Sequence, residues 1–258
     1  MRRAGLTTVR ATPNPGGYTP IWPPTKLPGC VAWLDMQETF TEVGGVVQHI
    51  LNMASGVDWI ELVNSPTYTV TGINGIPCMA GNQTAMRIVS SESAVVNTFL
   101  GATPRFTLFL VVSPITAPPT AAPLCYFGVG NSLVSSSNTM RFMRAGGALS
   151  VRAERIDDNG LSTSLVSRVP EISRPLVVCY RSWGTTTDLI IDNELRSGPL
   201  GIGITTPDQA ALLCRPDSVP DSFCSDMLGA ALVFDTALPI DAIRGLTAAL
   251  GGRWGIPA

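Results

Sequence analysis

The chain has 258 residues, of which 45% are hydrophobic and only 14% are charged, and its formal net charge is −2. This composition predicts a sizeable buried core and excludes disorder over most of the chain. The near-neutral charge excludes a strong field that would attract nucleic acid, so we expect no nucleic-acid partner. No apolar run approaches the length of about 20 residues that spans a bilayer, and the polar N-terminus lacks a secretory signal, so we expect no membrane insertion.

Residues 1–28 differ from the rest of the chain because six prolines lie between positions 13 and 28. Proline fixes φ and removes a backbone donor, so this segment cannot join the interior of a sheet and is predicted to be an extended arm. The arm also carries Tyr18, Ile21 and Trp22, which a plain spacer would not need. These three side chains are therefore candidate contact residues, either with the arm's own domain or with a neighbouring subunit.

Residues 29–258 show the pattern of one all-β domain, in which short apolar runs alternate with turn signals. We predict strands at residues 30–35, 46–53, 67–71, 85–90, 106–113, 124–129, 139–144, 149–156, 162–169, 176–183, 188–192, 210–215 and 228–234. Residues 106–112 are almost all apolar and predict a central strand covered on both sides. Residues 149–156 alternate, with Arg152 and Glu154 on a face that we expect to be wetted. Many short strands without alternating helices favour an antiparallel β-sandwich.

One helix is predicted at residues 240–250, where Ile240, Ile243 and Leu250 recur at helical spacing. Asp241 lies in its first turn, where the helix dipole favours an anion. The pair at residues 251–252 is glycine in both positions and predicts a left-handed stop. Trp254 is then expected to fold back onto the sheet as a cap.

Catalytic chemistry has little support in this sequence, and we predict no catalytic residues. His49 is the only histidine and lies inside an apolar run, so a nucleophile–histidine pair would depend on a strand residue. A retaining glycosidase needs two carboxyl groups roughly 5–5.5 Å apart. Asp188 with Asp192, and Asp192 with Glu194, are the nearest cases, and both fit a strand edge and a hairpin turn better.

Metal and cofactor binding are also not expected. The acidic turn at Asp157 and Asp158 precedes Gly160 and needs no cation to explain it. The six cysteines contain no Cys-x-x-Cys pair, which argues against zinc, and most lie in apolar runs that predict buried thiols.

Sugar binding requires an exposed aromatic ring with a few fixed polar groups around it. Trp33 lies in a strand that we expect to be buried, and Trp254 is expected to pack on the sheet after the C-terminal helix. Trp59 and Trp183 lie near polar or glycine-containing segments and are the candidate glycan-binding residues, although core packing remains the alternative for both.

The C-terminal sequence Arg253-Trp254-Gly255-Ile256, after a strand and a short helix, resembles the end of concanavalin A-like, laminin-G-like jelly rolls of bacteriophage virion proteins. Residues 27–35, with their Trp-Leu-Asp triplet, resemble the opening of such domains, and residues 106–112 and 176–193 are similar to their central and back strands. The resemblance implies a concanavalin A-like jelly roll with one short C-terminal helix and an extended N-terminal arm.

The resemblance also implies a role. The main hypothesis is a non-enzymatic virion structural protein of the capsid decoration or head-fibre type, made in the host cytoplasm, that docks through its N-terminal arm. Its partners would be other virion proteins, such as major capsid or tail proteins, with a homo-oligomer as a further candidate. The alternatives are a glycan-binding attachment module that contacts host-surface glycans, and a tail or baseplate component.

Overall fold

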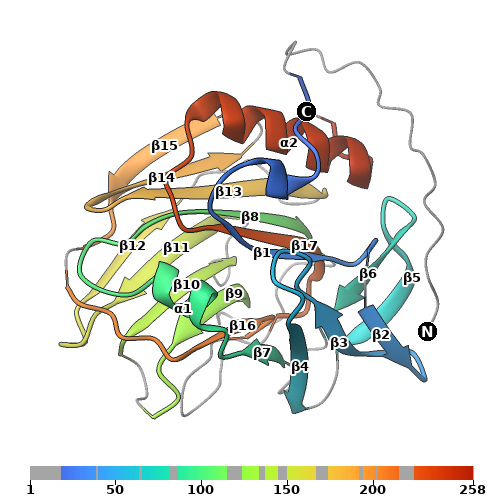
Figure 1. The fold of residues 1–258 in the computed structure, drawn as a ribbon, viewed down its shortest axis with the longest axis horizontal. Helices are drawn as coiled ribbons and strands as arrows, with labels where there is room; N and C mark the ends of the chain where they lie inside the picture. Colours follow the sequence, from blue (N-terminus) through green and yellow to red (C-terminus); the bar gives the residue numbers. More distant parts are fainter. Residues whose placement is uncertain are drawn as a thin grey trace.

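The structure is a computed structural model, and it describes residues 19–38, 40–63, 66–81, 87–114, 124–133, 137–144, 150–166, 174–191, 194–201, 203–214 and 224–257. Within these residues it contains seventeen strands, one short 3-10 helix and two α-helices. The strands form two stacked layers, with the longer helix lying above one of them (Figure 1). Tyr18 lies outside the described residues.

The first layer runs in the order β15–β14–β13–β8–β17–β1, and each neighbouring pair is antiparallel. Its strands are β1 (Cys30–Asp35), β8 (Arg105–Ser113), β13 (Leu176–Trp183), β14 (Thr186–Ile191), β15 (Glu194–Pro199) and β17 (Met227–Phe234). β8 lies in the middle, between β13 and β17, and all its residues after Arg105 are buried. The predicted central strand is therefore confirmed.

The second layer runs in the order β12–β11–β10–β9–β16–β7–β4–β3–β2, again antiparallel throughout. Its strands are β2 (Phe40–Val43), β3 (Val46–Leu51), β4 (Asp58–Val63), β7 (Arg87–Ser90), β9 (Leu124–Gly130), β10 (Thr139–Arg144), β11 (Val151–Ile156), β12 (Ser162–Val166) and β16 (Gln209–Leu212). The hairpin of β5 (Thr67–Ile73) and β6 (Ile76–Ala80) joins the layers, because β6 pairs with β17 and β5 meets β3.

Aromatic side chains fill the space between the layers. The ring of Phe142 on β10 lies 5.8 Å from Phe106 on β8 and 4.6 Å from Tyr180 on β13, measured between ring centroids. Phe99 and Phe127 join the same cluster, and all five residues have no exposed surface. Such contacts between strands of different layers define a β-sandwich, which confirms the predicted fold class.

The C-terminal helix α2 (Ile240–Trp254) covers the outer face of the first layer (Figure 1). It is longer than the predicted 240–250, because the glycines at 251 and 252 stay helical and the left-handed stop is Gly255, with φ 62°. After Gly255 the chain folds back against the last turn of the helix, where the N–H of Ile256 donates to the Gly251 carbonyl at 2.8 Å. Glycine is needed at 251 because a Cβ there would lie 2.9 Å from the Ile256 oxygen.

Trp254 closes this helix onto the sheet, as predicted. Its side chain is fully buried. A Cβ atom at Gly229 of β17 would lie only 2.7–2.9 Å from three atoms of its ring. Gly229 therefore provides the space in which the indole packs. Among the described helices, none has the length and apolar character needed to cross a bilayer.

The described part of the arm, residues 19–28, packs on its own domain. The N–H of Ile21 donates to the Gly245 carbonyl of α2 at 3.2 Å, and the Ile21 side chain fills the space that a Cβ at Gly245 would need. The Trp22 ring stands edge-on to Trp33 at 5.2 Å, with the Arg253 guanidinium 4.3 Å from its centroid. The sequence left open whether the arm contacts its own domain or a neighbouring subunit. Ile21 and Trp22 contact their own domain.

We expected Arg152 and Glu154 to lie on a solvent-exposed face of β11, and this expectation is wrong for Glu154. Glu154 is only 4% exposed, while Arg152 is half-buried. Glu154 is covered because it forms ion pairs with Arg141 and Arg152. All six cysteines lie in described segments and none is joined in a disulfide. Burial raises the pKa of the Cys78 thiol to about 11, which leaves it protonated and unreactive near neutral pH.

Candidate functional site

Trp183 is the last residue of β13, directly before Gly184, and 44% of its surface is exposed. The Arg181 guanidinium lies 4.2 Å from the centroid of its ring, so one side of the indole rests on a buried cation. The indole N–H donates to Asp188 Oδ2 at 2.8 Å. These two contacts hold an exposed aromatic ring in one orientation.

The support beneath the ring is a buried ion pair. Arg181 and Asp188 are 7% and 4% exposed, and the Arg181 Nε donates to Asp188 Oδ2 at 2.8 Å. Burial acts to raise the pKa of Asp188, but hydrogen bonds from Ser197, Trp183 and Arg181, together with the Arg181 charge, lower it below the ordinary value. Asp188 therefore stays ionised and keeps the indole N–H bound, and it does not suit the role of a general acid.

Arg105 stands beside this ring. It is the first residue of β8 and is paired in register with Trp183 of β13. Residues directly opposite each other in an antiparallel pair share one face of the sheet, with Cβ atoms about 4.5–5.5 Å apart. The exposed guanidinium and the exposed indole therefore lie next to each other on the sandwich surface.

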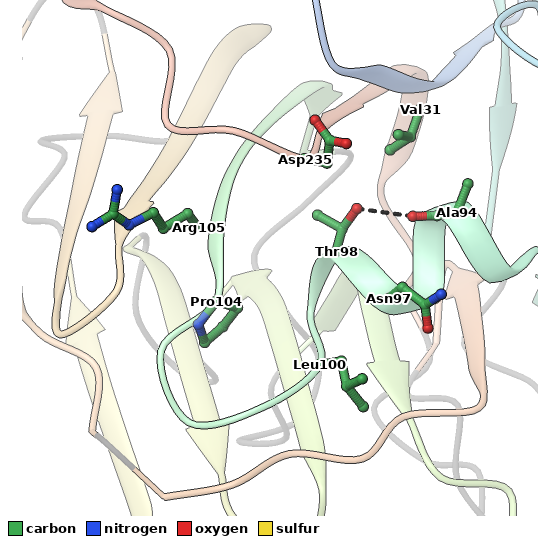
Figure 2. Close-up of a pocket in the computed structure, with 8 residues that line it drawn as sticks. All are labelled: Val31, Ala94, Asn97, Thr98, Leu100, Pro104, Arg105 and Asp235. Atoms are coloured by element: carbon green, nitrogen blue, oxygen red, sulfur yellow. Dashed lines mark hydrogen bonds between the residues drawn. The ribbon is translucent and has the colours of Figure 1, made fainter.

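Arg105 also lines a depression of about 400 Å³. Its lining comes from β1, α1 (Ser93–Thr98), the loop between α1 and β8, the start of β8 and the residue after β17: Val31, Ala94, Asn97, Thr98, Leu100, Pro104, Arg105 and Asp235. Figure 2 shows the Arg105 guanidinium directed away from the α1 side chains, while Thr98 is turned onto the Ala94 carbonyl. The surface thus offers an aromatic ring, a cation, a carboxylate and an amide.

Buried contacts fix the walls of the depression. The Arg155 guanidinium donates to the carbonyls of Gly101 and Ala102, at 2.7 and 2.8 Å, and so holds the loop between α1 and β8. Gly29 gives Asp235 its place, because a Cβ there would lie 2.3 Å from Asp235 Oδ1. Gly29 also has φ 79°, a left-handed conformation that favours glycine.

Trp59, the other candidate sugar platform, has no exposed surface. Its ring packs against Phe127 at 6.3 Å, and its indole N–H points at Glu92 Oε2, 3.4 Å away. Trp59 is a core residue in this structure, and a ring with no exposed face offers nothing to a sugar. The sequence placed Trp59 near a polar or glycine-containing segment, but it lies in β4 between two exposed residues, Asp58 and Ile60, and faces inward.

The acidic turn singled out in the sequence has a structural role. Asp157 Oδ1 accepts the backbone N–H groups of Asn159 and Leu161, both at 2.9 Å, which closes the turn as expected. Among the residues that the structure describes, no group of three or more His, Cys, Asp or Glu side chains could hold a metal ion. Asp192 lies outside the described residues, so the distances from its carboxyl group to those of Asp188 and Glu194 are not described.

The sequence pointed to Trp183, and to Asp188 only as half of a carboxylate pair, but not to the other residues around the ring. Arg105, Arg181 and Asp235 are separated from one another by more than fifty positions along the chain, and no motif joins them. Only strand register brings Arg105 beside Trp183.

Comparison with known proteins places the fold. No protein-family model and no curated protein matches this sequence. Among solved structures, the CBM40 carbohydrate-binding module of the Ruminococcus gnavus IT-sialidase matches 65% of this chain and 91% of its own, with 15% identity and a TM-score of 0.50. The same module bound to alpha2,6 sialyllactose matches 65% and 96%, at 15% identity and TM-score 0.50. The receptor-binding domain of botulinum neurotoxin type G matches 87% of this chain at 10% identity and TM-score 0.53, and this chain spans about half of that one (51%).

At these identities the likeness shows the fold alone, which is the jelly-roll β-sandwich expected from the sequence. None of the structures named here is a bacteriophage virion protein. The virion role, its location and the capsid or tail partners therefore stay predictions from the sequence resemblance.

Proposed function

We propose that this chain is a carbohydrate-binding β-sandwich domain whose contact surface consists of Trp183, Arg105 and the adjoining depression. The observation that carries the proposal is Trp183: an exposed indole that is held from one side by Arg181 and through its N–H by Asp188. Glycan binding is one of the alternatives that the sequence resemblance raised.

A fixed exposed indole suits a sugar for a physical reason. The C–H groups on one face of a pyranose ring are weakly positive and apolar, and they stack on the negative face of an aromatic ring. Binding costs less when the ring is already ordered, because less side-chain freedom is lost. The Arg181 and Asp188 contacts supply this order before any ligand arrives.

The polar groups around the ring would fix the orientation of the ligand. Arg105 presents donors to hydroxyl or acidic groups of a sugar, and Asp235 and Asn97 present acceptors and donors across the depression. A volume of about 400 Å³ lies within the roughly 300–1,000 Å³ range of small-molecule sites and fits a short oligosaccharide. The fold supports the proposal as well, because proteins named as carbohydrate-binding modules share it.

A glycan-array screen of the intact chain, followed by calorimetric titration of the best glycan, tests the proposal. Trp183→Ala should weaken binding about tenfold or more, since it removes the stacking surface. Leu133→Ala is a matched control, because Leu133 is an exposed apolar residue (86%) outside the site. The proposal fails if no glycan binds, or if both variants bind like the original protein.

A further inference from the structure

The outer face of the second layer carries a cluster of charges with more cations than anions. Arg141 on β10 pairs in register with Glu154 on β11, and Glu154 pairs in register with Ser164 on β12. Arg152, two residues before Glu154, projects from the same face of β11. The Arg141 guanidinium contacts Glu154 Oε2 and the Arg152 guanidinium contacts Oε1.

Two guanidinium groups thus share one carboxylate in a site that is largely removed from water. The side chains of Arg141, Glu154 and Arg152 are 10%, 4% and 29% exposed. The only other polar contact to this carboxylate among the described residues is the Ser162 hydroxyl, which donates to Oε1 at 3.2 Å. The cluster therefore holds one positive charge that no described side chain balances.

The two guanidinium groups also have donors left over, and among the described residues Oε2 of Glu154 is an acceptor without a hydrogen bond. The Nε atoms of Arg141 and Arg152 are buried and have no hydrogen-bond partner among the residues that the structure describes. Burial, and then repulsion from Arg141, lower the pKa of Arg152 below its ordinary value. An uncompensated buried charge is costly, because attraction to Glu154 must offset the desolvation of two cations.

We propose that Arg141 and Arg152 form a binding site for an oxyanion, a carboxylate or sulfate group, which would supply the missing negative charge. Planar guanidinium groups bind such anions through paired, charge-assisted hydrogen bonds. The anion reaches the cluster from the side of Arg152, the most exposed of the three. This site lies on the second layer, whereas Trp183 lies on the first, so neither proposal depends on the other.

Two substitutions of opposite effect test the site. Arg152→Gln removes one cation and should weaken anion binding about tenfold or more, whereas Glu154→Gln removes the competing carboxylate and should tighten it. Arg196→Gln is the matched control, since it removes an exposed arginine from β15 of the other layer. Glu154→Gln also guards against loss of folding, because a gain of affinity cannot come from a misfolded protein.

The measurement is a titration of the intact chain with sodium sulfate, glucuronate and glucose at constant ionic strength, followed by the arginine Nε–Hε signals in NMR spectra. Shifts of the Arg141 and Arg152 signals with sulfate support a site for oxyanions as such. Shifts with glucuronate alone assign the anion to an acidic sugar. The proposal is overturned if neither anion shifts these signals, if glucose acts equally, if Arg196→Gln weakens binding as much as Arg152→Gln, or if Glu154→Gln weakens it.

Discussion

Replacing Asp35 with asparagine should change how the stability of the fold depends on pH. Burial raises the pKa of the Asp35 carboxyl from 3.8 to about 6, although Arg253 and the Gln37 N–H act to lower it. A group whose pKa is higher in the folded state stabilises the fold below its unfolded pKa, and this contribution is lost as the pH rises through the folded value. One pKa unit corresponds to about 1.4 kcal/mol, so ionising Asp35 costs the folded protein about 3 kcal/mol.

The assay is urea unfolding of the original protein and Asp35→Asn at about pH 3 and about pH 8, where Asp35 is protonated and ionised in both states, respectively. Other titrating groups contribute almost equally to both proteins and cancel in the difference. The free energy of unfolding of Asp35→Asn, relative to the original protein, should rise by about 3 kcal/mol between the two conditions. A difference that stays flat, or falls, would refute the reasoning, because it would mean that Arg253 at 3.1 Å fully compensates the burial.

Three glycine substitutions test the packing of α2 and the arm. Gly229→Ala places a methyl group within 2.9 Å of the Trp254 ring and should lower the free energy of unfolding by about 1–3 kcal/mol, measured by urea unfolding. Gly245→Ala places a methyl group 2.8 Å from the Ile21 side chain, so residues 19–22 should be cleaved faster by protease while the sandwich stays folded; unchanged cleavage would contradict the docking of the arm. Gly255→Ala forces a left-handed conformation on alanine and should cost about 1 kcal/mol in the same urea experiment, and no loss would contradict the helix stop at this residue.

The sequence predicted those elements whose pattern is local. β1, β10 and β13 have the predicted bounds, because each is a compact run of apolar and β-branched residues between turn signals. Strands β2, β4, β6 and β15 were not predicted. For the edge strands β2 and β15 the reason is that most of their residues are exposed and show no apolar face. The six-residue helix α1 was also missed, because it is too short to show a helical period and has no side-chain cap.

The candidate site was predictable only in part, since long-range packing decides it. Both Trp59 and Trp183 follow or precede polar segments, yet one is fully buried and the other is exposed. Burial of Trp59 depends on Phe127 and Glu92, which are distant in sequence. Local pattern placed Trp183 on a strand and Trp59 on none, and it could not tell which of the two rings the other layer would cover.

The most direct test is the indole N–H signal of Trp183 in NMR spectra during titration with a glycan that the array selects. The chain has five tryptophans, and Trp59 and Trp254 have no exposed surface, so their signals serve as internal references. We expect the Trp183 signal to shift in a saturable way while those two stay in place. Saturable binding that leaves the Trp183 signal unmoved would contradict the claim that this ring is the carbohydrate contact.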